Sequence, residues 1–142
     1  KGKYKLTYYR DTTYTTTRTL TATVKDSTIT LSGMNLNLPY TFDEKTMSFV
    51  LETGSYAGKS GSDYIFTLLL DAKKEYNCNS MYGQLSHDAD GNVVVPFRSV
   101  YGGMEFSTIG LVKLTDNTFD VTKFNGYYQT LYRPTLTRVV TK

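Results

Sequence analysis

The sequence contains no tryptophan, one cysteine, one histidine and only three prolines among its 142 residues. A single cysteine excludes a disulfide within the chain and every multi-cysteine zinc or iron–sulfur site, and a single histidine excludes a His-rich metal centre. No apolar run approaches the roughly 18 residues that a membrane-spanning helix requires. We therefore expect no metal, no cofactor and no transmembrane segment in this chain.

The sequence also lacks any concentration of charge of one sign. It has 16 Lys and Arg residues against 13 Asp and Glu residues, a net charge of +3, and its longest basic run is the pair Lys73-Lys74. Nucleic-acid-binding domains usually gather basic residues into one patch or stripe. The scattered pattern found here predicts that nucleic acid is not a partner.

Residues that favour β-strands are abundant. The chain has 13 Tyr and 7 Phe, and about one residue in six is threonine, a composition typical of pleated, half-buried surfaces. The clearest alternation covers residues 14–25, where Leu20, Ala22 and Val24 share one face and threonines share the other. The nearest approach to a helix is residues 70–76, which could form a short helix or a polar connection. The composition therefore predicts an all-β protein.

About ten strands are expected, joined mostly by short turns. The Gly- and Ser-rich residues 53–62 are predicted to form a mobile surface loop, and residues 64–70 a strand covered on both faces. Further strands are expected at residues 104–114, 119–124, 127–132 and 135–141, and a hairpin at residues 81–97. Sequential hairpins favour an antiparallel up-and-down β-barrel, which hides strand edges, and a two-sheet β-sandwich is the alternative. No linker divides the chain, so residues 1–142 are predicted to form one β-barrel domain.

Three segments resemble functional motifs but lack essential parts. Residues 54–60 have only three residues between their glycines and precede a strand, whereas a phosphate-binding loop has four and precedes a helix. Residues 88–92 fit an acidic hairpin turn, with a weak calcium site as the alternative. Ser86, His87 and Asp88 are consecutive in a strand and point to alternate faces, so they cannot form a catalytic relay.

Isolated residues do not predict catalysis either. Cys78 lies in a polar stretch, and the chain has only one histidine that could activate it as a nucleophile. A glycosidase needs two carboxylates that converge across a cleft, and nothing in the spacing of Glu52 and Glu105 predicts that they meet. We expect no enzymatic activity.

The aromatic residues divide into a core set and a candidate binding set. Five phenylalanines alternate with polar neighbours and are predicted to face inward: Phe42, Phe49, Phe66, Phe106 and Phe119. The large inward residues Phe49, Leu51, Phe66, Leu68, Met104 and Phe106 are expected to fill most of the interior of so small a barrel.

Tyrosines in or beside loops suit contacts with proteins and with the apolar faces of sugar rings. The predicted site residues are Tyr127, Tyr128, Tyr132, Tyr76, Tyr82, Asn77 and Asn79. Tyr127 and Tyr128 follow a predicted Asn125-Gly126 turn, and Tyr128 and Tyr132 should share one strand face about 13 Å apart. A tyrosine-rich β surface that binds no ligand is the alternative.

The hairpins at residues 40–49 and 88–93, together with the Thr- and Tyr-rich opening strands, resemble those of lipocalin-like (calycin-like) domains. Such domains occur in secreted and surface lipoproteins of Bacteroidetes-type bacteria, often in glycan-acquisition systems. The resemblance implies an extracellular or outer-membrane surface location. Since the chain starts at Lys1 without an export signal, it further implies a mature fragment or one domain of a longer exported protein. The G-x-W signature of true lipocalins is absent, because the chain has no tryptophan.

Two functional hypotheses follow, from different classes. The first is a non-catalytic surface domain that binds a glycan or a partner protein through its loops. The second is a closed barrel that encloses a small apolar ligand. A purely structural spacer domain is a third possibility.

Overall fold

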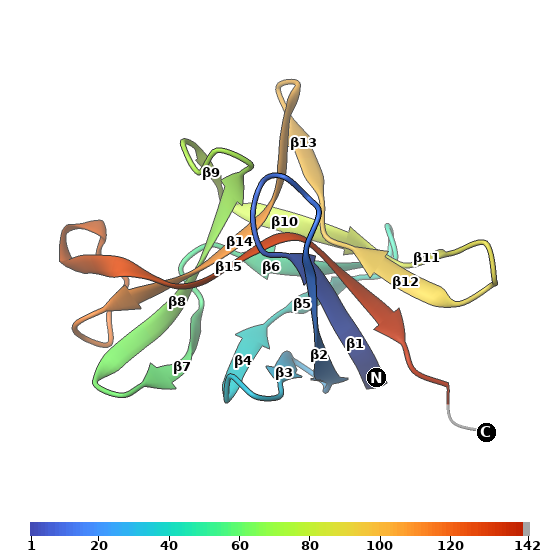
Figure 1. The fold of residues 1–142 in the computed structure, drawn as a ribbon, viewed down its shortest axis with the longest axis horizontal. Helices are drawn as coiled ribbons and strands as arrows, with labels where there is room; N and C mark the ends of the chain where they lie inside the picture. The colour runs from blue at the N-terminus through green and yellow to red at the C-terminus, as the bar shows by residue number, and fades with distance from the viewer. Residues whose placement is uncertain (141–142) are drawn as a thin grey trace.

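The computed structural model describes residues 1–140 and is built almost entirely of β-strands (Figure 1). The strands are β1 (Gly2–Tyr9), β2 (Thr17–Val24), β3 (Thr28–Leu31), β4 (Leu36–Pro39), β5 (Thr41–Asp43), β6 (Ser48–Glu52), β7 (Tyr56–Ser60), β8 (Asp63–Asp71), β9 (Asn77–Cys78), β10 (Ser80–Gln84), β11 (Ser86–His87), β12 (Val93–Pro96), β13 (Ser99–Tyr101), β14 (Met104–Leu114) and β15 (Phe124–Arg138). The only helix among these described residues is a single 3-10 turn, η1 (Val121–Lys123). The all-β prediction is confirmed.

The main sheet is antiparallel, strongly curled and continuous from the first strand to the last. Its path is β4-β3-β2-β1-β15-β14-β8-β7, with β9, β11, β12 and β13 attached beside it. Because β1 pairs with β15, the first and last strands lie side by side at the centre of the sheet. The end strands β4 and β7 pack against each other, and a Cβ atom on Gly58 would lie 3.0 Å from Leu36 Cδ2. The curl therefore produces a half-barrel of the expected antiparallel kind.

A small second sheet, β10-β6-β5, shares a hydrophobic core with the main sheet, and its strands cross the direction of β1 and β2 in Figure 1. The two sheets are tied together where Gly83 bridges Phe97 and where the Tyr82 amide donates to Ser99 Oγ at 2.9 Å. One hydrophobic cluster of 23 buried residues draws on both sheets, including Leu51 and Met81 from the small sheet and Leu111 and Leu136 from the main sheet. The core thus occupies the interior between the sheets.

The alternation predicted for the threonine-rich strand is present in β2, but the strand is shorter than predicted. Within β2, Ala22 and Val24 are buried, while the threonines on the other face are largely exposed. The strand begins at Thr17, however, and not at residue 14. Tyr14 adopts a φ of 54°, and the Arg10 amide donates to the Thr16 carbonyl at 3.0 Å to close a loop. The predicted strand over residues 14–25 was therefore too long.

The C-terminal third differs most from the prediction. Residues 119–124 do not form a strand, because Asp120 caps the turn η1 by accepting a hydrogen bond from the Thr122 amide. The Asn125-Gly126 pair lies inside β15, where the pairing shifts from Leu114–Phe124 to Val112–Tyr127. It forms a bulge and not the predicted turn, and β15 runs unbroken from Phe124 to Arg138. Residue 141, the end of the last predicted strand, lies outside the described residues.

Among the other connections, one prediction was wrong and the rest agree with the structure. The predicted mobile loop at residues 53–62 contains β7, which pairs with β8 and buries Ala57. Residues 70–76 form the end of β8 and a polar turn, in which the Asp71 carboxylate accepts from the amides of Glu75 and Tyr76. The predicted hairpin of residues 81–97 is confirmed, because Ser86 pairs with Val94, His87 with Val93 and Gly83 with Phe97, while the other edge of β10 pairs with β6. The covered strand β8 is confirmed.

Three of the five predicted core phenylalanines are buried, namely Phe49, Phe66 and Phe106, and Phe119 is half-buried. Phe42 is 39% exposed, because it lies on the three-residue edge strand β5 with only its edge contact to Phe49 beneath it. Met104 is 37% exposed, because it opens β14 in the β13–β14 hairpin that projects from the sheet (Figure 1). The inward assignment of Phe42 and Met104 was therefore wrong.

Candidate functional site

Three of the predicted tyrosines line one pocket of about 410 Å³, called here the tyrosine pocket. It is bounded by Tyr8, Arg10, Arg18, Lys74 and the β15 residues Tyr127, Tyr128, Gln129, Thr130 and Tyr132. The structure thus brings together the three tyrosines that the sequence singled out and adds cationic side chains to them.

The pocket exists because β15 extends beyond its partner β1. The last pair between these strands is Tyr9 with Tyr132, so from Phe124 to Leu131 β15 is paired with β14 alone. The other edge of β15 faces the end of the β1–β2 hairpin, which supplies Tyr8, Arg10 and Arg18. An unpaired strand edge presents backbone N–H and C=O groups, and these add to the hydrogen-bonding capacity of the pocket.

A bulge decides how the tyrosines point. Gln129 pairs with Leu111 and Tyr127 pairs with Val112, so Tyr128 is the extra residue. Leu131 belongs to the main core cluster and Tyr128 packs against it, so both lie on the inner face of β15. Tyr132 follows Leu131 in the regular part of the strand and therefore lies on the opposite face, where it is 8% exposed. The prediction that Tyr128 and Tyr132 share one face was wrong, because a bulge breaks strand alternation.

Tyr127 is held by its own contacts. Its ring covers Gly110, where a Cβ atom would lie 2.8 Å from Tyr127 Cε2, and Lys74 Nζ lies 4.5 Å from the ring centre. Burial raises the pKa of the Tyr127 hydroxyl, with a smaller contribution from Tyr132. The hydroxyl therefore remains protonated at neutral pH and can donate a hydrogen bond.

Tyr8, Arg10, Arg18 and Lys74 were missed by sequence reasoning. Tyr8 is 2% exposed, and its hydroxyl is buried without a hydrogen-bond partner. A signal was present, because Arg10 continues the alternation of the buried residues Leu6 and Tyr8, and Tyr8 pairs with Arg18. This alternation predicts that both arginine side chains start from the inner side of the hairpin, at its end. The position of Lys74 depends on tertiary contacts and had no such signal.

No protein-family model, curated protein or solved structure matches the chain.

The remaining predicted residues line other pockets. Tyr76, Asn77 and Asn79 border a pocket of about 560 Å³ beside Tyr101 and Phe106. There the Tyr101 hydroxyl donates to the Ser80 carbonyl at 2.7 Å, and Tyr76 is 58% exposed. Tyr82 borders a third pocket with Gln84 and Arg98. The structure therefore does not bring Tyr76, Tyr82, Asn77 and Asn79 to the tyrosine pocket.

Cys78 also lines the pocket of about 560 Å³, and the ionisation of its thiol gives a prediction about pH. Burial raises the pKa of its thiol to about 11, and the thiol donates to the Ser80 carbonyl. At pH 8 we expect about one thiol in a thousand to be ionised in the folded protein, against about a quarter in the unfolded chain with its ordinary pKa of about 8.5. Iodoacetamide should alkylate the folded protein far more slowly than the urea-unfolded chain, with a rate that rises steadily toward pH 11. Equal rates at pH 8 would show that the thiol is not shielded.

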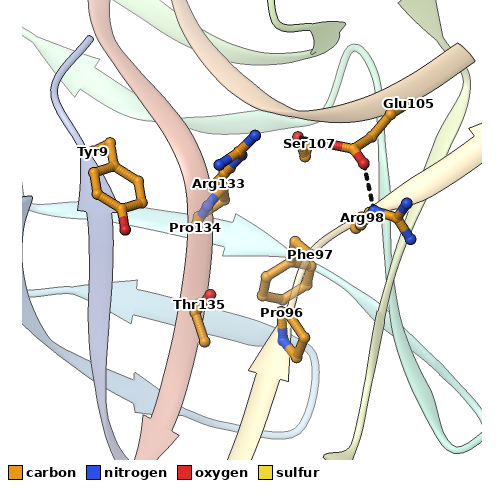
Figure 2. A pocket seen from close by; sticks show the side chains of 9 residues that line it. All are labelled: Tyr9, Pro96, Phe97, Arg98, Glu105, Ser107, Arg133, Pro134 and Thr135. Atoms are coloured by element: carbon orange, nitrogen blue, oxygen red, sulfur yellow. Dashed lines mark hydrogen bonds and ion pairs between the residues drawn. The ribbon is translucent and has the colours of Figure 1, made fainter. Parts of the chain in front are cut away.

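A fourth pocket, of about 350 Å³, lies where β14 and β15 diverge (Figure 2). Arg98 Nε lies 2.5 Å from Glu105 Oε1, and Ser107 Oγ donates to Glu105 Oε2 at 3.0 Å. These hydrogen bonds, the one from Arg98 above all, lower the pKa of Glu105. Glu105 is thus ionised and paired with Arg98. Glu52 on β6 accepts instead from Ser80 Oγ at 2.7 Å, so each carboxylate has its own partner.

Arg133 in this fourth pocket also supports the tyrosine pocket. In Figure 2 its side chain lies between Tyr9 and the Ser107–Glu105 pair. Its guanidinium carbon lies 3.6 Å from the centre of the Tyr14 ring, and Tyr14 contacts Tyr9 edge-on. Arg133 and Tyr14 both have positive φ, at 49° and 54°, a costly conformation for residues other than glycine. The stack holds the loop after β1 against β15, and this loop begins with Arg10.

No group of three or more His, Cys, Asp or Glu residues within residues 1–140 is arranged to hold a metal ion. In the same part of the chain, no helix is long and apolar enough to cross a bilayer.

Proposed function

We propose that this chain is a non-catalytic, extracellular or cell-surface domain that binds a glycan in the tyrosine pocket. The observation that carries the proposal is that Tyr127, Tyr128 and Tyr132 line one pocket beside the unpaired edge of β15. Its volume of about 410 Å³ falls in the usual range for small-ligand sites, roughly 300–1,000 Å³. The surface location is supported by the resemblance of the hairpins to those of lipocalin-like surface domains.

The composition of the pocket suits a sugar. A sugar ring has C–H faces that pack on an aromatic ring and hydroxyl groups that need hydrogen-bond partners. Tyr128 is half-buried against the core and so offers a ring that is already fixed, which lowers the entropic cost of binding. Gln129, Thr130 and the phenol groups supply donors and acceptors.

The packed interior favours a surface site over an interior ligand. Twelve large side chains are almost completely buried, among them Leu51, Met81 and Leu111. Because these residues come from both sheets, they fill the space that an enclosed apolar ligand would need.

A ring-removing substitution tests the proposal. Tyr128→Leu keeps an apolar side chain against the core but removes the aromatic face. We expect about fivefold weaker glycan binding, because an aromatic contact contributes on the order of 1 kcal/mol beyond its buried area. Binding is measured on a glycan array, followed by titration of the best ligand.

The matched control is Tyr56→Leu, which alters an exposed tyrosine on β7 outside the pocket and should leave binding unchanged. Thermal melts of both variants confirm that they are folded. Unchanged binding by folded Tyr128→Leu would reject the tyrosine pocket as the site. A wild-type chain that retains no glycan would reject the function and favour a structural spacer.

A further inference from the structure

The tyrosine pocket is lined by positive charge without compensating negative charge. Arg10, Arg18 and Lys74 border it, and none of its lining residues is acidic. The three salt bridges within residues 1–140 are Lys1–Asp26, Arg98–Glu105 and Lys123–Asp116, so they involve none of these three cations. The pocket therefore carries three cations that form no salt bridge with a carboxylate of residues 1–140.

Two acidic residues near the cations in the sequence, Asp11 and Asp71, have hydrogen-bond partners within their own loops. Asp11 accepts hydrogen bonds from the Thr13 hydroxyl and the Thr13 amide, which lower its pKa. Asp71 accepts from the amides of Glu75 and Tyr76 in the turn that carries Lys74. These carboxylates stabilise the two loops, and Arg10 makes only the smallest of the contributions that lower the pKa of Asp11.

Arg10 and Arg18 both line the pocket from the end of the β1–β2 hairpin. Arg18 pairs with Tyr8 across β1 and β2, and Arg10 is the first residue of the loop after β1. Two cations that line one pocket repel each other. An anion between the two guanidinium groups would remove that repulsion and accept several charge-assisted hydrogen bonds.

A second, independent observation points to a missing acceptor. The Tyr8 hydroxyl belongs to a residue that lines the pocket, and it is the only buried side-chain polar atom without a hydrogen-bond partner within residues 1–140. Buried hydroxyl groups are nearly always hydrogen-bonded, so each exception calls for an explanation. An oxygen-rich ligand would provide the partner.

We propose that the glycan is acidic, with a carboxylate or sulfate group bound between Arg10 and Arg18 and a sugar ring against Tyr128. This proposal rests on the proposed function, because it names the class of glycan that the same pocket takes. Lys74, fixed over the Tyr127 ring, places a third cation at the rim for an acidic group on a neighbouring sugar.

The first arm of the test compares ligands on the wild-type chain. An oligogalacturonate, a sulfated oligosaccharide, a neutral oligosaccharide of equal length, sodium sulfate and sodium phosphate are titrated by calorimetry. We expect at least one acidic oligosaccharide to bind about tenfold or more tightly than the neutral one, because hydrogen bonds between charged groups are the stronger kind. Raising the salt from about 20 mM to about 200 mM should weaken acidic binding, because salt screens exposed charges.

The second arm uses charge variants. Arg10→Gln combined with Arg18→Gln should abolish the preference for the acidic oligosaccharide. The matched control, Lys3→Gln with Lys5→Gln, removes the same formal charge from exposed positions of β1 outside the pocket and should keep the preference. Tyr8→Phe, which removes only the hydroxyl, should weaken acidic binding without lowering the melting temperature of the free protein.

The outcomes separate this inference from the proposed function. Equal binding of acidic and neutral oligosaccharides, with the arginine double variant behaving as wild type, would overturn the acidic preference and leave glycan binding in place. Retention of no oligosaccharide would overturn both. Binding of sulfate or phosphate with no oligosaccharide bound would overturn the saccharide assignment in favour of a simple anion site.

Discussion

Truncation of Phe106 to alanine is expected to lower the free energy of unfolding by about 3–5 kcal/mol. The Phe106 ring is buried in the main core cluster and contacts Tyr101 at 5.9 Å between ring centres. The backbone of Phe106 is paired with Asp71 of β8 on one side and with Ser99 of β13 on the other. Because the sheet holds these strands in place, they cannot move in to fill the cavity. For a chain of this size the melting temperature should fall by roughly 10 °C or more.

Phe42→Ala is the control for this experiment. It removes the same side chain from an exposed position on the edge strand β5, so the expected loss is about 1 kcal/mol. Chemical denaturation of the wild type and both variants measures the difference. If the Phe106 variant melted within a degree or two of the Phe42 variant, the assignment of Phe106 to the core would be wrong.

Substitution of Gly83 by alanine is expected to destabilise the protein by about 1–3 kcal/mol through overpacking. Gly83 lies in β10 of the small sheet and bridges Phe97 beside the main sheet. A Cβ atom there would lie 2.5 Å from Phe97 Cε1 and 2.8 Å from Val95 Cγ1, and both side chains are buried. Contacts this short force a shift, and because Phe97 and Val95 are both buried, the shift must disturb the packing between the two sheets.

The control is Gln84→Ala in the same strand, at an exposed position, where the change should stay within about 0.5 kcal/mol. The Gly83 variant should also lose protection of the Tyr82 amide from hydrogen exchange, because this amide donates to Ser99 Oγ across the junction of the sheets. Wild-type stability and protection would show that the sheets are not tightly packed at Gly83.

The candidate site could be predicted in part. Tyr127, Tyr128 and Tyr132 stood out because they are close together near a glycine, and they do line one pocket. Their orientation could not be derived, because the bulge at Tyr128 depends on the pairing with Leu111 and Val112 of β14. Arg10 and Arg18 could have been placed on the inner face by parity, but only the end of β1 at Tyr9 leaves them beside β15.

The sequence by itself determined the strand content of this protein. Strand formation depends on β-branched and aromatic residues and on an alternation between near neighbours, and both are visible within a few residues, as in β2 and β14. Only the tertiary structure decided which strands adjoin, where β15 bulges and which loops meet at the tyrosine pocket. The pairing of β1 with β15 and the approach of Lys74 to Tyr127 join residues far apart in the chain. Such contacts are selected by packing and by the hydrogen bonding of the whole sheet, and no local pattern encodes them.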